Sequence, residues 1–197
     1  MSLQQTFVLT GASGSFGSAI KTALEQEGNQ VATLRYQRDW TYDDYSGADD
    51  KLRAADVLVL AHGSRVDQAM AANCDSFIAL IERFRRLKAG HPSTPEIWAV
   101  GSEIELHPSW GNKDLLIYSR SKRAFARYAA GLFRDPSVTY RHIVPSAFTS
   151  RMGPGLMSGE TAARVALFLI RRGWRYVPVT YTGVALANYF RFRKLAS

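Results

Sequence analysis

Short apolar runs alternate along this chain with longer segments whose apolar residues recur at helical spacing. The period changes repeatedly, which predicts strands and helices in turn rather than separate blocks of each. The apolar runs predict strands at 6–10, 31–35, 56–61, 97–101, 138–144 and 175–179. The helical spacing predicts helices at about 15–27, 47–54, 66–88, 113–133 and 159–172.

The run at 57–61 is apolar at every position rather than at alternate ones. Such strands are typical of parallel sheets that helices cover on both faces. We therefore expect an α/β fold, a Rossmann-type doubly wound parallel sheet. No repeat or Pro/Gly-rich linker divides the chain, so we expect one domain over 1–197, with 180–197 as a C-terminal extension. In these sheets ligands bind beyond the carboxyl ends of the strands.

Three glycines, Gly11, Gly14 and Gly17, lie between the first predicted strand and the first predicted helix. Glycine lets the backbone turn sharply and approach a pyrophosphate, whose charge is then held by amide groups at the helix N-terminus. A glycine-rich loop can also be a turn that merely permits close helix packing. Its place at the start of an alternating pattern favours a nucleotide site.

The second predicted strand ends at Arg35, with Arg38 three residues later. Folds that prefer NAD usually place a carboxylate at this strand end, whereas an arginine can bind a 2′-phosphate. Arg35 therefore favours NADP(H) over NAD(H), and Arg38 is a candidate to assist, although both side chains can also be plain surface residues. We expect the segment 39–44 to form a short third strand and a loop beside the adenine.

Tyr118 and Lys122 are four residues apart in a predicted helix, so their side chains project from one face. A free phenol, with a pKa of about 10, is a poor acid-base group at neutral pH, but a nearby ammonium favours the phenolate. Such a pair also arises by chance. The pair becomes evidence for a catalytic site because of the order of motifs before it: the glycine loop, Arg35, a strand ending at 61–63, a strand ending at Ser102, and then this helix.

In this order of motifs the chain resembles the short-chain dehydrogenase/reductase family from Thr10 to about Val179. The resemblance implies an NADP-dependent enzyme that transfers hydride between nicotinamide and a carbonyl or alcohol substrate. It implies Tyr118 as the acid-base group, Lys122 as a ligand of the nicotinamide ribose that lowers the Tyr118 pKa, and Ser102 as a hydrogen-bond partner of the substrate oxygen. Asn73 resembles the family asparagine that kinks its helix and organises a proton-relay water, although an Asn in a helix is more often a surface or capping residue.

The loop 145–149 resembles the family loop that contacts the nicotinamide end, which would bring Val144, Pro145 and Thr149 near the cofactor. The expected cofactor-binding residues are Gly11, Ser13, Gly14, Ser15, Phe16, Gly17, Arg35, Ala61, His62, Gly63, Tyr118, Lys122, Pro145 and Thr149. By the same resemblance, the helices at 66–88 and 113–133 would pair subunits in a homodimer or homotetramer.

Several features depart from the family pattern. The residues at 60–63 replace an Asn-Asn-Ala-Gly motif, which removes a polar strand-end stabiliser and leaves His62 without an assigned role. Ser102 lies sixteen residues before Tyr118, farther than usual; Ser109, in the intervening loop, is the weaker alternative. The 150–158 region lacks a long substrate-covering insertion, so we expect an open site. Its candidate apolar walls are Trp110, Phe148, Met152 and Met157.

The formal charge of +8 keeps a second function class open: a non-catalytic dinucleotide-binding sensor or scaffold with a basic interaction surface. The tail at 189–194 interleaves aromatic and basic residues, which is compatible with lipid headgroups or bases. We expect instead that its rings dock on the core and its cations stay in solvent, so neither nucleic acid nor a membrane surface is the expected partner.

Composition excludes other classes of site. Cys74 is the single cysteine, so no intrachain disulfide forms, and the four histidines show no metal-ligand spacing. No metal is expected. With no targeting or membrane-spanning pattern, we expect a soluble, cytoplasmic protein.

Overall fold

The computed structural model describes residues 4–66, 68–106, 113–150 and 153–195. A six-stranded parallel sheet runs through its centre in the order β2-β1-β3-β4-β5-β8. Its strands are β1 (Thr6–Thr10), β2 (Gln30–Leu34), β3 (Val57–Leu60), β4 (Glu96–Val100), β5 (Thr139–Pro145) and β8 (Tyr176–Val179). The predicted doubly wound α/β fold and the six expected strands are therefore confirmed.

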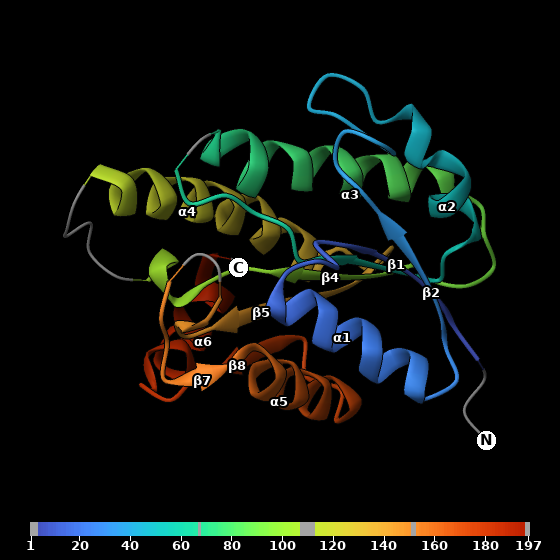
Figure 1. The fold of residues 1–197 in the computed structure, drawn as a ribbon. Coiled ribbons are helices and arrows are strands. Elements are labelled where there is room, and N and C mark those ends of the chain that lie inside the picture. Colours follow the sequence, from blue (N-terminus) through green and yellow to red (C-terminus); the bar gives the residue numbers. More distant parts are fainter. Residues whose placement is uncertain (1–3, 67, 107–112, 151–152, 196–197) are drawn as a thin grey trace.

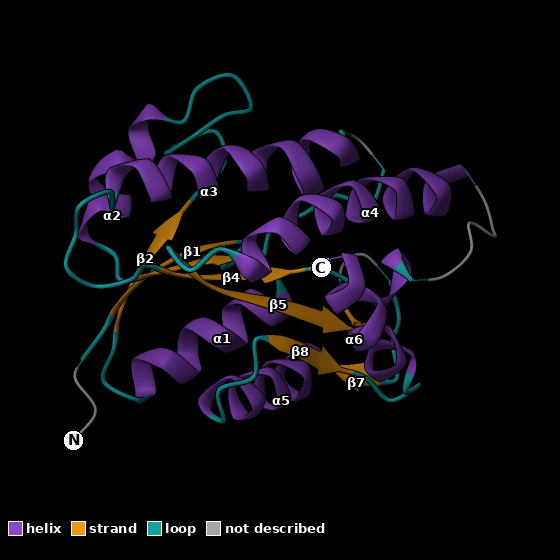
Figure 2. Cartoon of the chain, turned by 180° about the vertical axis from the view of Figure 1, so that it is seen from behind, coloured by secondary structure: helices purple, strands orange, loops and turns teal. Residues whose placement is uncertain are grey.

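Helices cover both faces of the sheet (Figure 1), as its fully apolar strands require. One face packs on α1 (Ser15–Gln26) and α5 (Gly159–Arg171). The other packs on α2 (Asp49–Ala54), α3 (Ser76–Leu87), α4 (Lys113–Arg134) and α6 (Val184–Leu195). Short 3-10 turns, η1 (Ser46–Ala48) and η3 (Glu103–Glu105), and a π-helical turn, η2 (Ala71–Asp75), complete this list. Figure 2 shows the same layers from behind.

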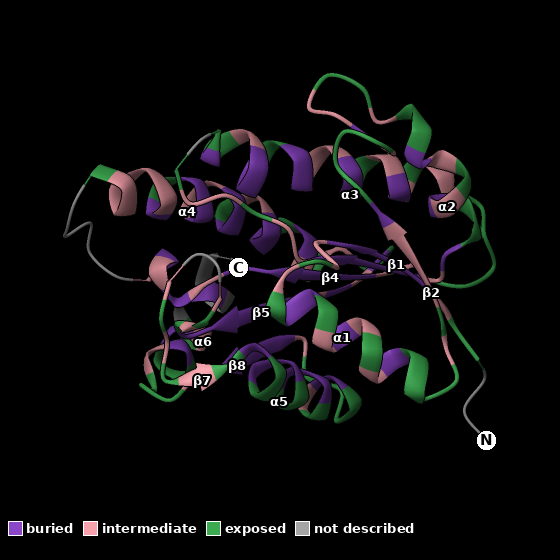
Figure 3. Cartoon of the chain, in the orientation of Figure 1, coloured by how far each residue is buried: buried purple, intermediate pink, exposed green. Residues whose placement is uncertain are grey.

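The central strand β3 shows why the sequence is apolar at every position. Val57 and Val59 face the core beneath α1 and α5, whereas Leu58 and Leu60 face the core beneath α3 and α4. All four are fully buried, and Figure 3 shows the buried strands between exposed outer helix faces. Each position thus removes apolar surface from water, the dominant favourable contribution to folding.

The sheet reverses its direction of growth between β1 and β3, since β2 lies on one side of β1 and the later strands lie on the other. Thr10, at the end of β1, is in register with Leu60, at the end of β3. The glycine loop and the segment after β3 therefore leave the sheet side by side. This switch point is the place where open α/β sheets bind ligands.

The expected strand within 39–44 is wrong. Gln37 has a φ of 65°, so the chain turns back after β2, and only an isolated bridge joins Tyr36 to Trp40. Trp40 is buried against the rings of Tyr36 and Tyr45. Aromatic packing at the sheet edge thus replaces a further strand.

The C-terminal extension is part of the packed structure. Its α6 contacts β8 and α4, with Ala185 and Phe192 in the core. The long helix expected at 66–88 begins instead at Ala69, and its first turns contain the wide η2 turn. Within the described residues, no helix combines the length and apolarity needed to cross a membrane.

Candidate active site

The glycine loop joins β1 to α1 through contacts that leave no room for side chains. Gly11 has a φ of +71°, and a Cβ there would lie 2.4 Å from the Ala61 carbonyl oxygen. A Cβ on Gly17 would lie 2.2 Å from the Gly11 carbonyl oxygen. Both glycines are therefore required by the packing of the loop itself.

Gly14 differs, because a Cβ there would meet only the Gly11 carbonyl oxygen, at 3.4 Å. The fold does not require glycine at this position, whereas a pyrophosphate lying on the loop does. Gly14 is also the N-cap of α1, where no side chain caps the helix and the first turn has no acidic residue. The partial positive charge at the N-terminus of α1 therefore has no carboxylate in the first turn to offset it. The loop is suited to bind a phosphate group of a dinucleotide.

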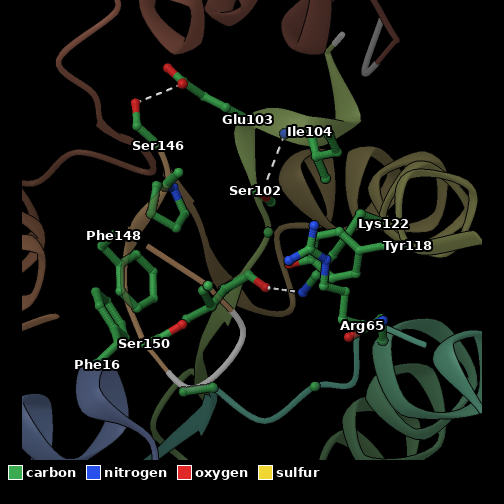
Figure 4. A pocket seen from close by; sticks show the side chains of 18 of the residues that line it. Phe16, Arg65, Ser102, Glu103, Ile104, Tyr118, Lys122, Ser146, Phe148 and Ser150 are labelled. Carbon is green, nitrogen blue, oxygen red and sulfur yellow. Dashed lines mark hydrogen bonds between the residues drawn. The ribbon is translucent and has the colours of Figure 1, made fainter. Parts of the chain in front are cut away.

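Two hollows open from this point, and both are lined by His62 and Gly63. The first, of about 650 Å³, extends from the glycine loop past Arg35. The second, of about 530 Å³, extends from Phe16 to Tyr118 (Figure 4). Shared walls make them two lobes of one cleft, an arrangement that suits the two ends of a dinucleotide.

The hollow at the end of β2 contains the predicted cofactor-selecting residue. Arg35 is exposed and lines it together with Tyr36, Tyr42 and Lys21. Arg38 does not line it; its Nε lies 3.6 Å from an Asp39 carboxylate oxygen. Of the two candidate arginines, the structure brings only Arg35 to the cleft.

The second hollow brings together the four residues predicted to carry chemistry: Asn73, Ser102, Tyr118 and Lys122. Ser102 follows β4, and its Oγ accepts a hydrogen bond from the Ile104 amide at 3.3 Å. Tyr118 and Lys122 reach the hollow from α4, with the Lys122 Nζ 5.9 Å from the Tyr118 ring centre. The Lys122 ammonium donates to the Val100 carbonyl at 2.9 Å, which fixes it at the end of β4 (Figure 4).

Burial dominates the acid-base properties of this pair. It raises the pKa of the Tyr118 phenol to about 12, while the Ser102 side chain and Arg65 act to lower it. It lowers the pKa of the Lys122 ammonium to about 8, against the opposing effect of Glu105. The expected lowering of the Tyr118 pKa by Lys122 stays a prediction.

Asn73 lies in the η2 turn and is fully buried. Its Nδ2 donates to the Ser64 carbonyl at 2.6 Å and to the Ser121 Oγ at 3.0 Å, and its Oδ1 accepts from the Ser64 amide at 3.2 Å. A Cβ on Gly63 would lie 2.5 Å from this Oδ1. Asn73 thus ties the loop after β3 to α4, and the wide turn lies at the position where the resemblance implies a kink.

His62 itself is a polar stabiliser at the end of β3. Its Nδ1 lies 2.7 Å from the Thr10 Oγ1 and its Nε2 lies 2.9 Å from the Ser76 Oγ. The ring also packs on Trp40 and Phe77. It therefore links the end of β1 to α3, and burial lowers its pKa to about 3, so that it stays neutral at physiological pH.

The lowered pKa of His62 predicts a pH dependence of stability. An unfolded histidine binds a proton below about pH 6.5, whereas folded His62 does so only near pH 3. As pH falls from about 6.5 to 5, the unfolded state gains a proton that the folded state does not bind, so the free energy of unfolding drops with a slope that approaches about 1.4 kcal/mol per pH unit. Urea titrations measure this slope; His62→Asn should reduce it, while the exposed His91→Asn should retain it. Equal slopes in wild type and His62→Asn would contradict the interpretation.

Of the remaining predicted residues, some line the second hollow and others do not. Pro145 and Phe148 line the second hollow, and the Phe148 ring packs 5.8 Å from that of Phe16. Thr149 lies outside the lining, where its Oγ1 donates to the Gly155 carbonyl at 3.0 Å. Val144 and Met157 pack into the two cores instead, so neither borders the hollow. Ser109, Trp110 and Met152 lie outside the described residues.

Two charged residues of this hollow, Arg65 and Glu103, were not predicted from the sequence. Arg65 comes two residues after Gly63, and its position beyond a strand end was the available signal. Glu103 directly follows Ser102 and is buried; its carboxylate accepts hydrogen bonds from the Ser146, Thr180 and Thr182 hydroxyls and the Ala185 amide. Burial alone would raise the pKa of Glu103, but these four hydrogen bonds hold it below its ordinary value.

Solved structures with the same arrangement of strands and helices identify the fold. A short-chain dehydrogenase from Burkholderia cenocepacia in complex with NADP superposes with a TM-score of 0.77 over 98% of this chain and 96% of its own, at 16% identity. The fold is that of the short-chain dehydrogenase/reductases. A short-chain dehydrogenase from Sphingobium yanoikuyae in complex with NADPH shares it, with a TM-score of 0.73 over 96% of this chain and 93% of its own, at 16% identity. So does a bulky-bulky ketone specific alcohol dehydrogenase from Comamonas testosteroni, with a TM-score of 0.74 over 96% and 92% of the two chains, at 15% identity.

Among curated proteins, a monoglucosyldiacylglycerol epimerase from Synechocystis sp. is 27% identical over 92% of this chain. The chain spans about half, 52%, of the length of that relative. No protein-family profile matches the chain. Among the described residues, no group of three or more His, Cys, Asp and Glu side chains is arranged to hold a metal ion.

Proposed function

We propose that this protein is an NADP(H)-dependent oxidoreductase that transfers hydride between nicotinamide and a carbonyl or alcohol substrate. One observation carries the proposal: a single cleft, divided by His62 and Gly63, has Arg35 in one lobe and Tyr118 with Lys122 in the other. The fold and its NADP- and NADPH-bound neighbours support a nicotinamide dinucleotide as the cofactor.

The residues of the second lobe would move the proton. When bound, the cofactor supplies or accepts the hydride. In the reductive direction Tyr118 donates its phenolic proton to the substrate oxygen, and Ser102 donates a hydrogen bond to the same oxygen. The two side chains already interact with each other. Lys122 would bind the nicotinamide ribose, and its positive charge would stabilise the phenolate form of Tyr118 that remains after the proton is transferred.

The choice of NADP(H) rests on Arg35, and it gives a direct test. Arg35→Ala should weaken NADPH binding by about tenfold or more, because a charge-assisted contact with the 2′-phosphate is lost, and should leave NADH affinity unchanged. Titrations of both cofactors by fluorescence measure the two constants. Arg38→Ala, which removes a neighbouring cation outside the cleft, is the matched control. Equal affinity for both cofactors, unaltered by Arg35→Ala, would remove the basis for the cofactor choice.

The reaction itself is tested by NADPH consumption across a panel of aldehydes and ketones. If neither NADPH nor NADH binds at millimolar concentration, the proposal fails outright. Cofactor binding without turnover, together with a salt-dependent partner, would favour the sensor or scaffold considered from the sequence.

The epimerase relative supports one further candidate reaction of the same site. An epimerase with a nicotinamide cofactor can oxidise a carbinol carbon and return hydride to its other face, so the cofactor shows no net consumption. Conversion of a glycolipid hexose to its epimer, with the cofactor spectrum unchanged at the end, would distinguish this reaction from net reduction. The substrate, the dimer or tetramer and the cytoplasmic location stay predictions.

A further inference from the structure

The positive charge of the chain is concentrated at its C-terminal end. The formal charge is +8, yet the segment 161–197 contains no Asp or Glu at all. Its basic residues are Arg164, Arg171, Arg172, Arg175, Arg191, Arg193 and Lys194. This segment therefore provides nearly the whole excess of cations.

The same part of the chain exposes large apolar side chains. Phe168 and Leu186 are each 50% exposed, and Phe190 is 75% exposed. Figure 3 shows the outer face of α5 as exposed. The exposed large apolar residues of α5, of the two ends of β8 and of α6 are Val165, Phe168, Trp174, Tyr181, Leu186 and Phe190. We call this set, with Arg164 and Arg172, the C-terminal surface.

The fold gathers these residues around one edge of the sheet. β8 is the edge strand, and α5 and α6 pack on it from opposite faces. Arg171 forms an ion pair with Glu27, the C-cap residue of α1, so this side of α5 faces the end of α1. Arg172, one residue on, is turned about 100° from it and lies over the Phe168 ring at 4.2 Å. Phe168 and Arg172 therefore lie on a different side of α5 from the ion pair with Glu27.

We propose that the C-terminal surface docks on an anionic lipid surface. Apolar and aromatic side chains flanked by cations suit the headgroup region of a membrane, where rings enter the interface and guanidinium groups meet lipid phosphates. A second copy of this chain would bring the same cations face to face, which like-charge repulsion opposes. Nucleic acid would satisfy the cations but would leave the exposed Val165 and Leu186 without apolar contacts.

This proposal revises the expectation that a membrane surface is not a partner. That expectation rested on the rings of the 189–194 segment docking on the core. Phe192 does so and is 2% exposed, but Phe190 points outward together with Leu186, four residues earlier on the same side of α6. Only the structure separates the two rings.

The surface extends to the mouth of the proposed active site. Tyr181, at the end of β8, lines the second hollow and donates from its hydroxyl to the Ala147 carbonyl at 3.0 Å. Docking at this edge would bring the mouth of that hollow close to the lipid headgroups. The proposal does not depend on the reaction, because binding to vesicles is measured without turnover.

The test is co-sedimentation of the full chain with vesicles of phosphatidylcholine alone, or with about a third of the lipid replaced by phosphatidylglycerol. We expect binding to the anionic vesicles that weakens with added salt. Arg164→Gln/Arg172→Gln should weaken it roughly 25-fold, about fivefold for each cation removed. Leu186→Ser/Phe190→Ser should weaken it by about tenfold.

The matched controls carry equivalent changes at residues outside the C-terminal surface. Arg86→Gln/Arg127→Gln removes two exposed cations from α3 and α4, and Val66→Ser/Met70→Ser removes two exposed apolar side chains. Both should bind vesicles as wild type does. No binding to anionic vesicles, equal losses in the controls, or a dimer that dissociates in Leu186→Ser/Phe190→Ser would each overturn the proposal. So would tight binding to a single-stranded oligonucleotide in place of vesicles.

Discussion

Tyr118→Phe should lower kcat by about 10²–10⁴-fold, because the substrate oxygen loses its proton donor. The aromatic ring stays, so the wall of the hollow and the packing of α4 are retained. NADPH affinity should change by no more than about fivefold, the equivalent of one hydrogen bond. Steady-state kinetics with any substrate that the wild type reduces, together with a cofactor titration, separate the two effects.

The matched control lies on the same helix. Tyr128→Phe also removes one phenolic hydroxyl, but this hydroxyl donates to the Glu82 carboxylate of α3 and lies outside the hollow. Its kcat should equal that of the wild type. Full activity in Tyr118→Phe would exclude the phenol as proton donor and would remove the chemical part of the proposed function.

Replacing Gly17 or Gly14 of the loop should separate an effect on stability from an effect on cofactor binding. Gly17→Ala places a methyl group 2.2 Å from the Gly11 carbonyl oxygen, and the backbone must move to admit it. We expect the free energy of unfolding to fall by about 3 kcal/mol or more. Gly14→Ala meets only a 3.4 Å contact, so its stability should match the wild type within about 1 kcal/mol. Its methyl group would meet the pyrophosphate, and NADPH affinity should fall about tenfold or more.

Gly131→Ala is the control for this series. Gly131 lies in α4 with nothing within 4 Å of the added Cβ, so the change should stabilise the protein by up to about 1 kcal/mol and leave binding unchanged. Urea unfolding and cofactor titration of the three variants provide the comparison. A Gly14→Ala variant that binds NADPH as tightly as the wild type would argue against a phosphate on this loop.

The parts of the fold that the sequence predicted are those with a local signal. Each of the six sheet strands is a short apolar run, and Tyr118 and Lys122 share a helix face by spacing alone. The segment 39–44 misled because its aromatic residues suit a strand, whereas its packing depends on the positive φ of Gln37 and on burial of Trp40. Tertiary contacts, rather than the local sequence, therefore determine that this segment is not a strand.

The hidden parts of the site depend on partners far away in the chain. Glu103 is a buried carboxylate only because hydroxyls and an amide 43 to 82 residues later turn toward it. His62 links two elements through Thr10 and Ser76, which lie 52 and 14 residues away. No periodicity or motif indicates such pairings. Sequence spacing therefore predicted Tyr118 and Lys122, but it did not predict the hydrogen bonds of Glu103 and His62 that hold the site together.

Glu103 has a mechanical consequence. It follows Ser102 directly, and its carboxylate holds the turn between β8 and α6 through Thr180, Thr182 and Ala185. Moving that turn outward would strip three donors from a buried negative charge, which is strongly unfavourable. A displacement of α6 would therefore also displace Glu103 and, through the next peptide unit, Ser102. The substrate end of the cleft should thus move with the C-terminal helix as one rigid unit.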